Sequence, residues 1–286
     1  MIHKTAIIEE GAIIGENVEI GAYAYIGSKV KIGDNTKIMH HATIEGKTTI
    51  GKGNVIFPYA AVGTMPQDLK YTGEDTELII GDNNKIREFT LINTGTIQDD
   101  SKTIIGSNNL FMGYVHVAHD CVIGNNCIFA NAATLAGHVH IDDGAVIGGM
   151  TPIHQFVHIG SLAMIAGASA VSQDVPPFCM VEGNRAKLRG LNLTGLRRQF
   201  NDRKDIDEIK KTYKKLFESN QPLKDVANEI LENTENIYVK KLCEFVLNSK
   251  RGIAYDRKMW FLWSSRNRRE STIRGWKCKN LSKLCN

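Results

Sequence analysis

A hydrophobic residue returns at every sixth position along most of the first 171 residues of this chain. Three runs carry the repeat: Ile8, Ile14, Ile20, Ile26, Ile32, Ile38, Ile44, Ile50, Ile56 and Val62; then Ile80, Ile86 and Ile92; then Ile105, Phe111, Val117, Ile123, Phe129, Leu135, Ile141, Ile147, Ile153, Ile159, Ile165 and Val171. A period of six matches neither the turn of an α-helix nor the simple alternation of a β-strand. This repeat is therefore the strongest constraint on the fold.

Each hexapeptide also contains a turn signal and a second apolar column. Glycine often follows the anchor, as at Gly15, Gly21, Gly27, Gly33 and Gly51. Four residues after the anchor the side chain is small or β-branched, as in Val18, Ala24, Val30, Thr36, Ala42, Thr48, Cys121, Cys127, Ala133, Val139 and Ala145. A repeat of this kind is typical of a parallel β-helix, in which three short strands form one triangular coil and coils stack about 4.8 Å apart.

The pattern predicts a mainly β chain with a hexapeptide-repeat β-helix at residues 1–178 and a C-terminal helical domain at residues 179–256. The repeat is expected to end at Pro176 and Pro177, because proline cannot continue a central strand. Apolar residues at helical spacing then predict helices around residues 206–217, 226–231 and 239–246. Residues 64–79 and 93–104 interrupt the repeat and are expected to project as loops, where functional residues tend to gather.

Composition argues against an integral membrane protein, because no apolar stretch approaches the roughly 18 residues of a transmembrane helix. The six cysteines lack metal or disulfide spacing and the N-terminus lacks a signal-peptide pattern, so we expect a cytoplasmic protein. Residues 257–286 hold nine Lys or Arg, one Glu and all three tryptophans. We interpret them as a non-native or disordered tail; the alternative is a basic aromatic arm for a membrane surface or nucleic acid.

Histidines gather on one face of the expected column. The anchors Val117, Leu135 and Ile153 are 18 positions apart, so they should share that face on three successive coils. Four imidazoles lie beside these anchors, within about 10 Å along the face: His116, His119, His138 and His154.

The spacing also places a possible proton acceptor below a main-chain donor. His119, Gly137 and Gln155 occupy the same position of the hexapeptide and should stack. A neutral imidazole can take a proton from a hydroxyl or amine near neutral pH, and Asp120 is adjacent to hold its tautomer. A glycine N–H can donate to the oxyanion of an attacked thioester. The pattern favours acyl transfer at a site completed by a second subunit, because a triangular column has no deep cleft of its own.

Five stretches resemble the bacterial acyl-[acyl-carrier-protein]–UDP-N-acetylglucosamine O-acyltransferase family: QDLKY (67–71), HVAHDC (116–121), NAATLAGHV (131–139), IGGMTPIHQF (147–156) and QDVPPF (173–178). The likeness covers residues 1–251 in order and spacing. It implies a left-handed β-helix, a homotrimer, and transfer of a 3-hydroxyacyl group from acyl carrier protein to position 3 of UDP-N-acetylglucosamine, the first step of lipid A biosynthesis. It also implies that no metal or other cofactor takes part and that no acyl-enzyme forms.

The resemblance implies roles residue by residue. His119 matches the catalytic base, Asp120 its partner, Gly137 the backbone donor to the thioester oxygen, and Gly167 a position that helps to set acyl-chain length. The substrate-contacting positions are Gln67, Asp68, Lys70, His116, His138, His154, Gln155, Asn192 and Arg198. Thr194 and Gln199 depart from the family pattern, which leaves the nucleotide contacts open. Some members use a sugar with a 3-amine, so an ester and an amide product both stay open.

A basic segment supports an acidic protein partner. Between residues 185 and 204 a single acid, Asp202, stands against Arg185, Lys187, Arg189, Arg197, Arg198, Arg203 and Lys204. Such a patch would attract an acyl carrier protein, which is acidic and helical. The segment lacks the interleaved aromatic residues that favour nucleic-acid binding.

Three other functions compete with this interpretation. A hexapeptide-repeat transferase that uses acetyl-CoA would need no carrier protein. A zinc hydro-lyase is possible on the same fold, because three imidazoles can bind Zn²⁺. A noncatalytic or ice-binding scaffold would show flat threonine ladders, whereas the outward columns here are mixed and charged.

Overall fold

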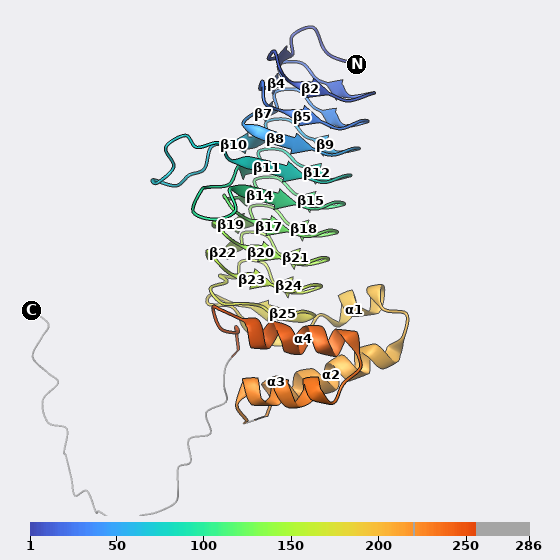
Figure 1. Cartoon of the computed structure of the whole chain (residues 1–286). Helices are drawn as coiled ribbons and strands as arrows, with labels where there is room; N and C mark the ends of the chain where they lie inside the picture. Colours follow the sequence, from blue (N-terminus) through green and yellow to red (C-terminus); the bar gives the residue numbers. More distant parts are fainter. Residues whose placement is uncertain (220, 256–286) are drawn as a thin grey trace, which may run out of the picture.

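The computed structural model describes residues 1–219 and 221–255. A three-sided column of short strands begins at the N-terminus, and helices pack against its far end (Figure 1). From Ile20 to Val171 every anchor of the hexapeptide repeat is at most 3% exposed, whereas Ile8 and Ile14 in the open first coil are half-buried. The inward direction of the anchors, and with it the predicted β-helix, is confirmed.

Each side of the column is one sheet. The first sheet contains β1 (Ile7–Ile8), β4 (Tyr25–Ile26), β7 (Thr43–Ile44), β10 (Ala61–Thr64), β13 (Leu91–Asn93), β16 (His116–Val117), β19 (Thr134–Leu135) and β22 (Pro152–Ile153). The second contains β2 (Ile13–Ile14), β5 (Lys31–Ile32), β8 (Lys47–Ile50), β11 (Glu77–Ile80), β14 (Lys102–Ile105), β17 (Val122–Ile123), β20 (His140–Ile141) and β23 (His158–Ile159). The third contains β3 (Glu19–Ile20), β6 (Lys37–Ile38), β9 (Val55–Ile56), β12 (Lys85–Ile86), β15 (Leu110–Phe111), β18 (Ile128–Phe129), β21 (Val146–Ile147), β24 (Met164–Ile165), β25 (Cys179–Glu182) and β26 (Lys187–Leu191).

The register follows the repeat except at two insertions. Ile8 pairs with Ile26, one coil of 18 positions later, but Ile50 pairs with Ile80 and Ile80 with Ile105. The additional residues form loops at 65–76, between β10 and β11, and at 94–101, between β13 and β14. The first of these projects from the column (Figure 1). Both insertions were expected to be loops, and both lie where the chain passes from the first sheet to the second.

The prolines do not end the third sheet. Beyond Pro176 and Pro177, β25 pairs in parallel with β24, and β26 then pairs antiparallel with β25. Proline lacks an N–H, but these two residues stand in the turn between Val175 and β25, where no ladder hydrogen bond needs one. The stack of strands therefore extends past the expected end of the repeat.

Within the described residues four helices follow: α1 (Leu193–Gln199), α2 (Arg203–Phe217), α3 (Leu223–Glu232) and α4 (Ile237–Asn248). The three predicted helices correspond to α2, α3 and α4, whose apolar faces form a second core with Phe178 of the last coil. Side chains cap two of them, since Asp202 accepts from Lys204 N and Asn236 from Tyr238 N. Short α1 was not predicted, because seven residues contain too few periods to be recognised.

No helix among the described residues is long and apolar enough to cross a membrane. The prediction of a non-native or disordered tail at residues 257–286 lies outside the described residues.

Candidate active site

One edge of the column collects most of the predicted site residues. In successive coils the passages from the first sheet to the second are the loops 65–76 and 94–101 and then the turns 118–121, 136–139 and 154–157. These passages contain Gln67, Asp68, Lys70, His119, Asp120, Gly137, His138, His154 and Gln155. We call this the catalytic edge. The hexapeptide period produces it, because equal spacing puts equivalent turns above one another.

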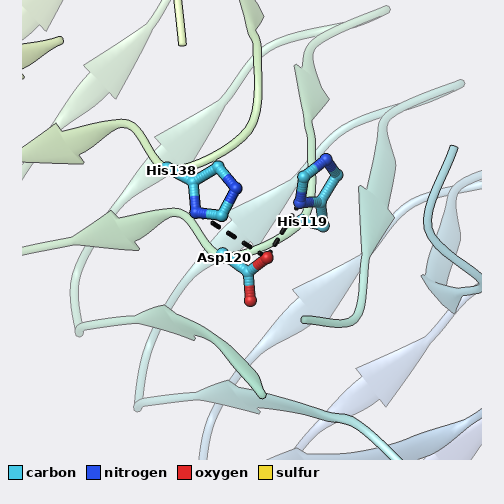
Figure 2. A group of neighbouring side chains, drawn as sticks. All are labelled: His119, Asp120 and His138. Carbon is cyan, nitrogen blue, oxygen red and sulfur yellow. Dashed lines mark hydrogen bonds and ion pairs between the residues drawn. The ribbon is translucent and has the colours of Figure 1, made fainter. Parts of the chain in front are cut away.

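His119 and Asp120 form a hydrogen-bonded pair in the turn after β16. Nδ1 of His119 lies 2.8 Å from Oδ2 of Asp120 (Figure 2). A carboxylate can only accept, so Nδ1 carries a proton, and in the neutral ring Nε2 is left with its lone pair. Asp120 has a φ of 59°, in the left-handed region. This turn conformation lets two consecutive side chains meet.

Asp120 is buried, and both of its carboxylate oxygens accept hydrogen bonds. Its side chain is 1% exposed, compared with 13% for that of His119. Thr96 donates twice, from its backbone N to Oδ1 at 2.7 Å and from Oγ1 to Oδ2 at 2.5 Å. Burial alone raises the pKa of Asp120, but the hydrogen bonds from His119 and Thr96 outweigh it and hold that pKa below its usual range. Asp120 is therefore an anion at neutral pH.

Gly137 lies directly against the imidazole of His119 from the next coil. A Cβ atom at position 137 would stand 2.5 Å from Cε1 and 2.7 Å from Nε2 of His119, closer than atoms can approach. Among the described residues, none accepts a hydrogen bond from the Gly137 N–H. The glycine makes room for the ring and leaves a main-chain donor available beside it.

His138 is the second imidazole of the cluster. Its ring lies 5.1 Å from that of His119 and nearly perpendicular to it, and it stacks on Phe156 at 4.4 Å. Nδ1 of His138 is 2.8 Å from Oδ2 of Asp99, and 3.9 Å from Oδ2 of Asp120. Figure 2 shows Asp120 between the two imidazoles. Sequence reasoning missed both Asp99 and Thr96.

The other two predicted site histidines, His116 and His154, differ in burial. His116 points outward from β16 but is largely covered, and burial lowers its pKa, so the ring is neutral at neutral pH. Its Nδ1 is buried and makes no hydrogen bond within the described part of the chain. His154 is exposed, with Nδ1 3.1 Å from the carbonyl of Gln155, which is also exposed.

Gln67, Asp68 and Lys70 lie farther along the catalytic edge in the projecting loop. Their local structure is internal to the loop, since Oδ1 of Asp68 accepts from Lys70 N at 2.9 Å. Gln67 and Lys70 are exposed. Within residues 1–219 and 221–255, none of these three side chains forms a hydrogen bond or ion pair with His119.

Asn192, Arg198 and Gly167 lie away from the catalytic edge. Asn192 is buried and caps α1, accepting from Gly195 N at 3.0 Å and donating to Leu162 O at 2.9 Å. Arg198 is exposed on α1. Gly167 follows β24 at the edge between the third and first sheets, where a Cβ would meet only Gly149, at 3.5 Å. Asn192 thus has a structural function that the sequence did not indicate.

The cluster at the catalytic edge also has the composition of a cation site. One donor atom from each of His119, Asp120 and His138 lies within 4.8 Å of the others. However, Oδ2 of Asp120 already accepts from His119 and from the Thr96 hydroxyl. A cation there would have to displace both hydrogen bonds. The arrangement fits a carboxylate that orients an imidazole better than it fits a metal ligand.

Comparison with known proteins identifies the family. A family model described as "Bacterial transferase hexapeptide (six repeats)" matches residues 102–137, and one described as "Udp N-acetylglucosamine O-acyltransferase; Domain 2" matches residues 174–254. The acyl-[acyl-carrier-protein]–UDP-N-acetylglucosamine O-acyltransferase of Aliarcobacter butzleri is 68% identical over 257 residues, which is 90% of this chain and 99% of that protein. The same enzyme of Sulfurimonas denitrificans is 69% identical over 257 residues, covering 90% and 98%.

A solved structure of a related acyltransferase has the same fold. The UDP-N-acetylglucosamine acyltransferase from Campylobacter jejuni has 51% sequence identity and a TM-score of 0.87, covering 90% of this chain and 100% of that one. The left-handed β-helix with a helical C-terminal region is thereby confirmed. By its sequence relatives, its fold and its repeat, this chain belongs to the acyl-[acyl-carrier-protein]–UDP-N-acetylglucosamine O-acyltransferase family of enzymes.

Proposed function

We propose that this enzyme transfers a 3-hydroxyacyl group from acyl carrier protein to the 3-hydroxyl of UDP-N-acetylglucosamine, the first step of lipid A biosynthesis. The names of relatives about two thirds identical along nearly their whole length support this activity. The observation that carries the chemistry is the hydrogen bond from Nδ1 of His119 to Asp120, because it leaves Nε2 free to accept a proton.

His119 is the general base of the proposed reaction. Its Nε2 takes the proton of the sugar hydroxyl while the hydroxyl oxygen attacks the thioester carbonyl carbon. The Gly137 N–H donates to the oxyanion that forms. The C–S bond then breaks, the carrier's thiolate leaves, and the imidazolium of His119 returns a proton to the sulfur. Asp120 stabilises that imidazolium, as a buried carboxylate does in other His-dependent acyl transfers.

The substrate contacts remain proposals taken from the resemblance. The residues proposed to bind the sugar nucleotide, the pantetheine arm or the acyl chain are Gln67, Asp68, Lys70, His116, His138, His154, Gln155, Asn192 and Arg198. The unpaired buried Nδ1 of His116 supports a role there, since a polar atom without a partner is costly unless a ligand or another subunit supplies one. Asn192 already uses both its amide atoms, so its contribution to binding is indirect.

A homotrimer is proposed because the first sheet has an uncharged outer face. Its outward residues are Ile7, Tyr25, Thr43, Ala61, Leu91, His116, Thr134 and Pro152. Lysines and glutamates stand outward on the other two sheets, as at Glu19 and Lys37 or Lys47 and Glu77. Depletion of charge is the compositional mark of an interface core.

The edge between the third and first sheets supports the same interface. It carries an exposed column of stacked rings, in which Tyr23, His41, Tyr59, Phe89 and Tyr114 follow one another with centroids 5.0 to 5.2 Å apart. Gly167 stands on this edge, whereas His119 stands on the opposite edge of the first sheet. Three chains around an axis facing their first sheets would bring the Gly167 edge of one to the catalytic edge of the next.

The carrier protein is proposed to dock on the helical end. Arg185, Arg189, Arg197, Arg198, Arg203 and Lys204 are exposed there, and clustered cations attract an acidic partner. We also propose that the enzyme acts in the cytoplasm and requires no metal, other cofactor or nucleic acid. A division into domains at residues 178 and 179 stays a prediction.

A donor and acceptor assay tests the proposed function. Purified enzyme is given 3-hydroxyacyl carrier proteins or acetyl-CoA as donors, and UDP-N-acetylglucosamine or its 3-amino analogue as acceptors, with products read by mass spectrometry. We expect acyl transfer from the carrier protein to the 3-hydroxyl sugar. Transfer from acetyl-CoA alone would favour the competing transferase, and an amide product would identify the amino sugar as the acceptor.

A further inference from the structure

The catalytic edge holds two imidazoles and two carboxylates in contact, and the pairing between them is not fixed by the repeat. Asp120 Oδ2 lies within reach of Nδ1 of His119 at 2.8 Å and of Nδ1 of His138 at 3.9 Å. The hexapeptide explains why the two histidines occupy neighbouring turns. It does not explain why Asp120 accepts a hydrogen bond from His119, because a small rotation of an unrestrained carboxylate would let it accept from His138 instead.

Loop 94–101 supplies the missing constraint on Asp120. Gly95 passes so close to the main chain of Ser101 and Lys102 that a Cβ there would overlap both residues. This close passage turns Thr96 inward, where it is fully buried. The Thr96 N–H and hydroxyl then bind one carboxylate oxygen each, at 2.7 and 2.5 Å. Two donors on two oxygens fix the rotation of the carboxylate group.

The same loop supplies a second carboxylate. Asp99, three residues after Thr96, accepts from Nδ1 of His138 at 2.8 Å. The Asp99 side chain is 42% exposed, whereas that of His138 is 11% exposed and stacked on Phe156. His138 therefore has its own acceptor and does not compete for Asp120.

We propose that loop 94–101 assigns each imidazole of the site its own carboxylate, with Thr96 holding Asp120 on His119 and Asp99 holding His138. Both are positioning residues, because each acts through another side chain. The inference rests on the proposed function in taking His119 as the base. It adds a reason for the interruption of the repeat, since the longer loop 94–101 provides side chains for the carboxylate of one imidazole and for the other imidazole directly.

The two residues should affect different kinetic constants. Thr96 acts through Asp120 on the base, so its hydroxyl contributes to the chemical step and to kcat. Asp99 acts on His138, one of the residues proposed to contact substrate. We assign the contact of His138 to the sugar nucleotide, so the loss of Asp99 should act on KM for that substrate. Each carboxylate fixes the tautomer of its histidine with a proton on Nδ1. Nε2 of each ring therefore points away from the carboxylate that accepts from Nδ1.

Thr96→Val tests the first assignment. We expect kcat to fall about tenfold or more with KM nearly unchanged, because hydrogen bonds to charged groups correspond to factors of that order. Thr96→Ser keeps the hydroxyl and should restore most of the rate. Thr90→Val is the matched control, since Thr90 is equally buried but its hydroxyl donates to the Met112 carbonyl and not to a carboxylate. A Thr96→Val enzyme as active as the Thr90→Val enzyme, or a Thr96→Ser enzyme as slow as Thr96→Val, would overturn the assignment.

Asp99→Asn tests the second assignment, with Asp100→Asn as control on the adjacent exposed acid. We expect KM for UDP-N-acetylglucosamine to rise several-fold in Asp99→Asn alone, in line with the loss of one charge-assisted hydrogen bond. An unchanged KM in Asp99→Asn, or an equal rise in Asp100→Asn, would count against it.

A spectroscopic readout separates this inference from the proposed function. In protein labelled with ¹⁵N-histidine, the ring nitrogen shifts report which nitrogen of His119 and His138 is protonated. We expect the His138 signals to change in Asp99→Asn and not in Asp100→Asn, and the His119 signals to change in Thr96→Val and not in Thr90→Val. Unchanged signals would refute the loop's role even with His119 as base. If His119→Ala stays active, the proposed function fails whatever these signals show.

Discussion

The imidazole of His119 occupies the space that a side chain at position 137 would need, one coil farther along the column. This contact between His119 and Gly137 depends on the register of the β-helix, because the two positions are 18 residues apart and pair turn over turn. The repeat itself brings the turn that holds the proton acceptor next to a main-chain N–H. The proposed stabilisation of the oxyanion depends on this contact.

Gly137→Ala should therefore displace the base without unfolding the protein. The new methyl group would push the imidazole aside, and we expect kcat to fall by about 100-fold, the order of loss for a catalytic group misplaced by about 1 Å. The matched control is Gly27→Ala in the turn after β4, on the same edge of the column but outside the site, where the methyl would meet Glu45 Cα at 3.4 Å and Ile44 O at 3.6 Å. Steady-state kinetics with both variants measures the difference; equal rates would contradict the contact.

Asp120→Asn should change the stability of the protein in acid. Because hydrogen bonds from His119 and Thr96 hold the folded-state pKa of Asp120 below its usual value of 3.8, its carboxylate contributes stability that is present above that value. The contribution is lost as pH falls through the folded-state pKa. The wild type should lose unfolding free energy more steeply below about pH 4 than Asp120→Asn does. Urea unfolding at a series of pH values checks this, and parallel curves for the two proteins would contradict it.

Gly167→Met should shorten the preferred acyl chain. The position is open, so the fold should accept the side chain, whose length would then obstruct the groove proposed between subunits. Competition among carrier proteins loaded with chains of different length measures the preference. A chain-length profile identical to that of the wild type would show that Gly167 does not limit the chain.

Removal of metal should leave the activity unchanged. Asp120 Oδ2 is occupied by hydrogen bonds from His119 and Thr96, so the site is arranged for proton transfer. Enzyme dialysed against a chelator, with metal content measured by mass spectrometry, should keep its kcat. Loss of activity together with one zinc per chain, and recovery on adding zinc, would instead support the hydro-lyase.

The sequence predicted the column and the stacking along the catalytic edge because both depend only on the spacing of residues in the repeat. From Ile105 to Val171 the period of six is unbroken and fixes which turns lie above one another, so the contact of His119 with Gly137 could be inferred before any coordinates. The roles assigned to these residues stay predictions until variants are measured.

Loop 94–101 could not be predicted in the same way. The break in the repeat marked it as a loop, but the path of an irregular segment depends on contacts such as the approach of Gly95 to Lys102, which leave no periodic signal. Thr96 and Asp99 were missed for that reason. The capping function of Asn192 was missed because short α1 was missed, and β25 because two prolines suggested an end.

The turnover of His119→Ala is the most direct test of the account. It is measured with a 3-hydroxyacyl carrier protein and UDP-N-acetylglucosamine, while light scattering determines the mass of the assembly. The ring lies outside the hydrophobic column, so we expect the same assembly as the wild type and a loss of rate of at least about 100-fold, as for removal of a general base. A rate near that of the wild type in an intact assembly would contradict His119 as the base.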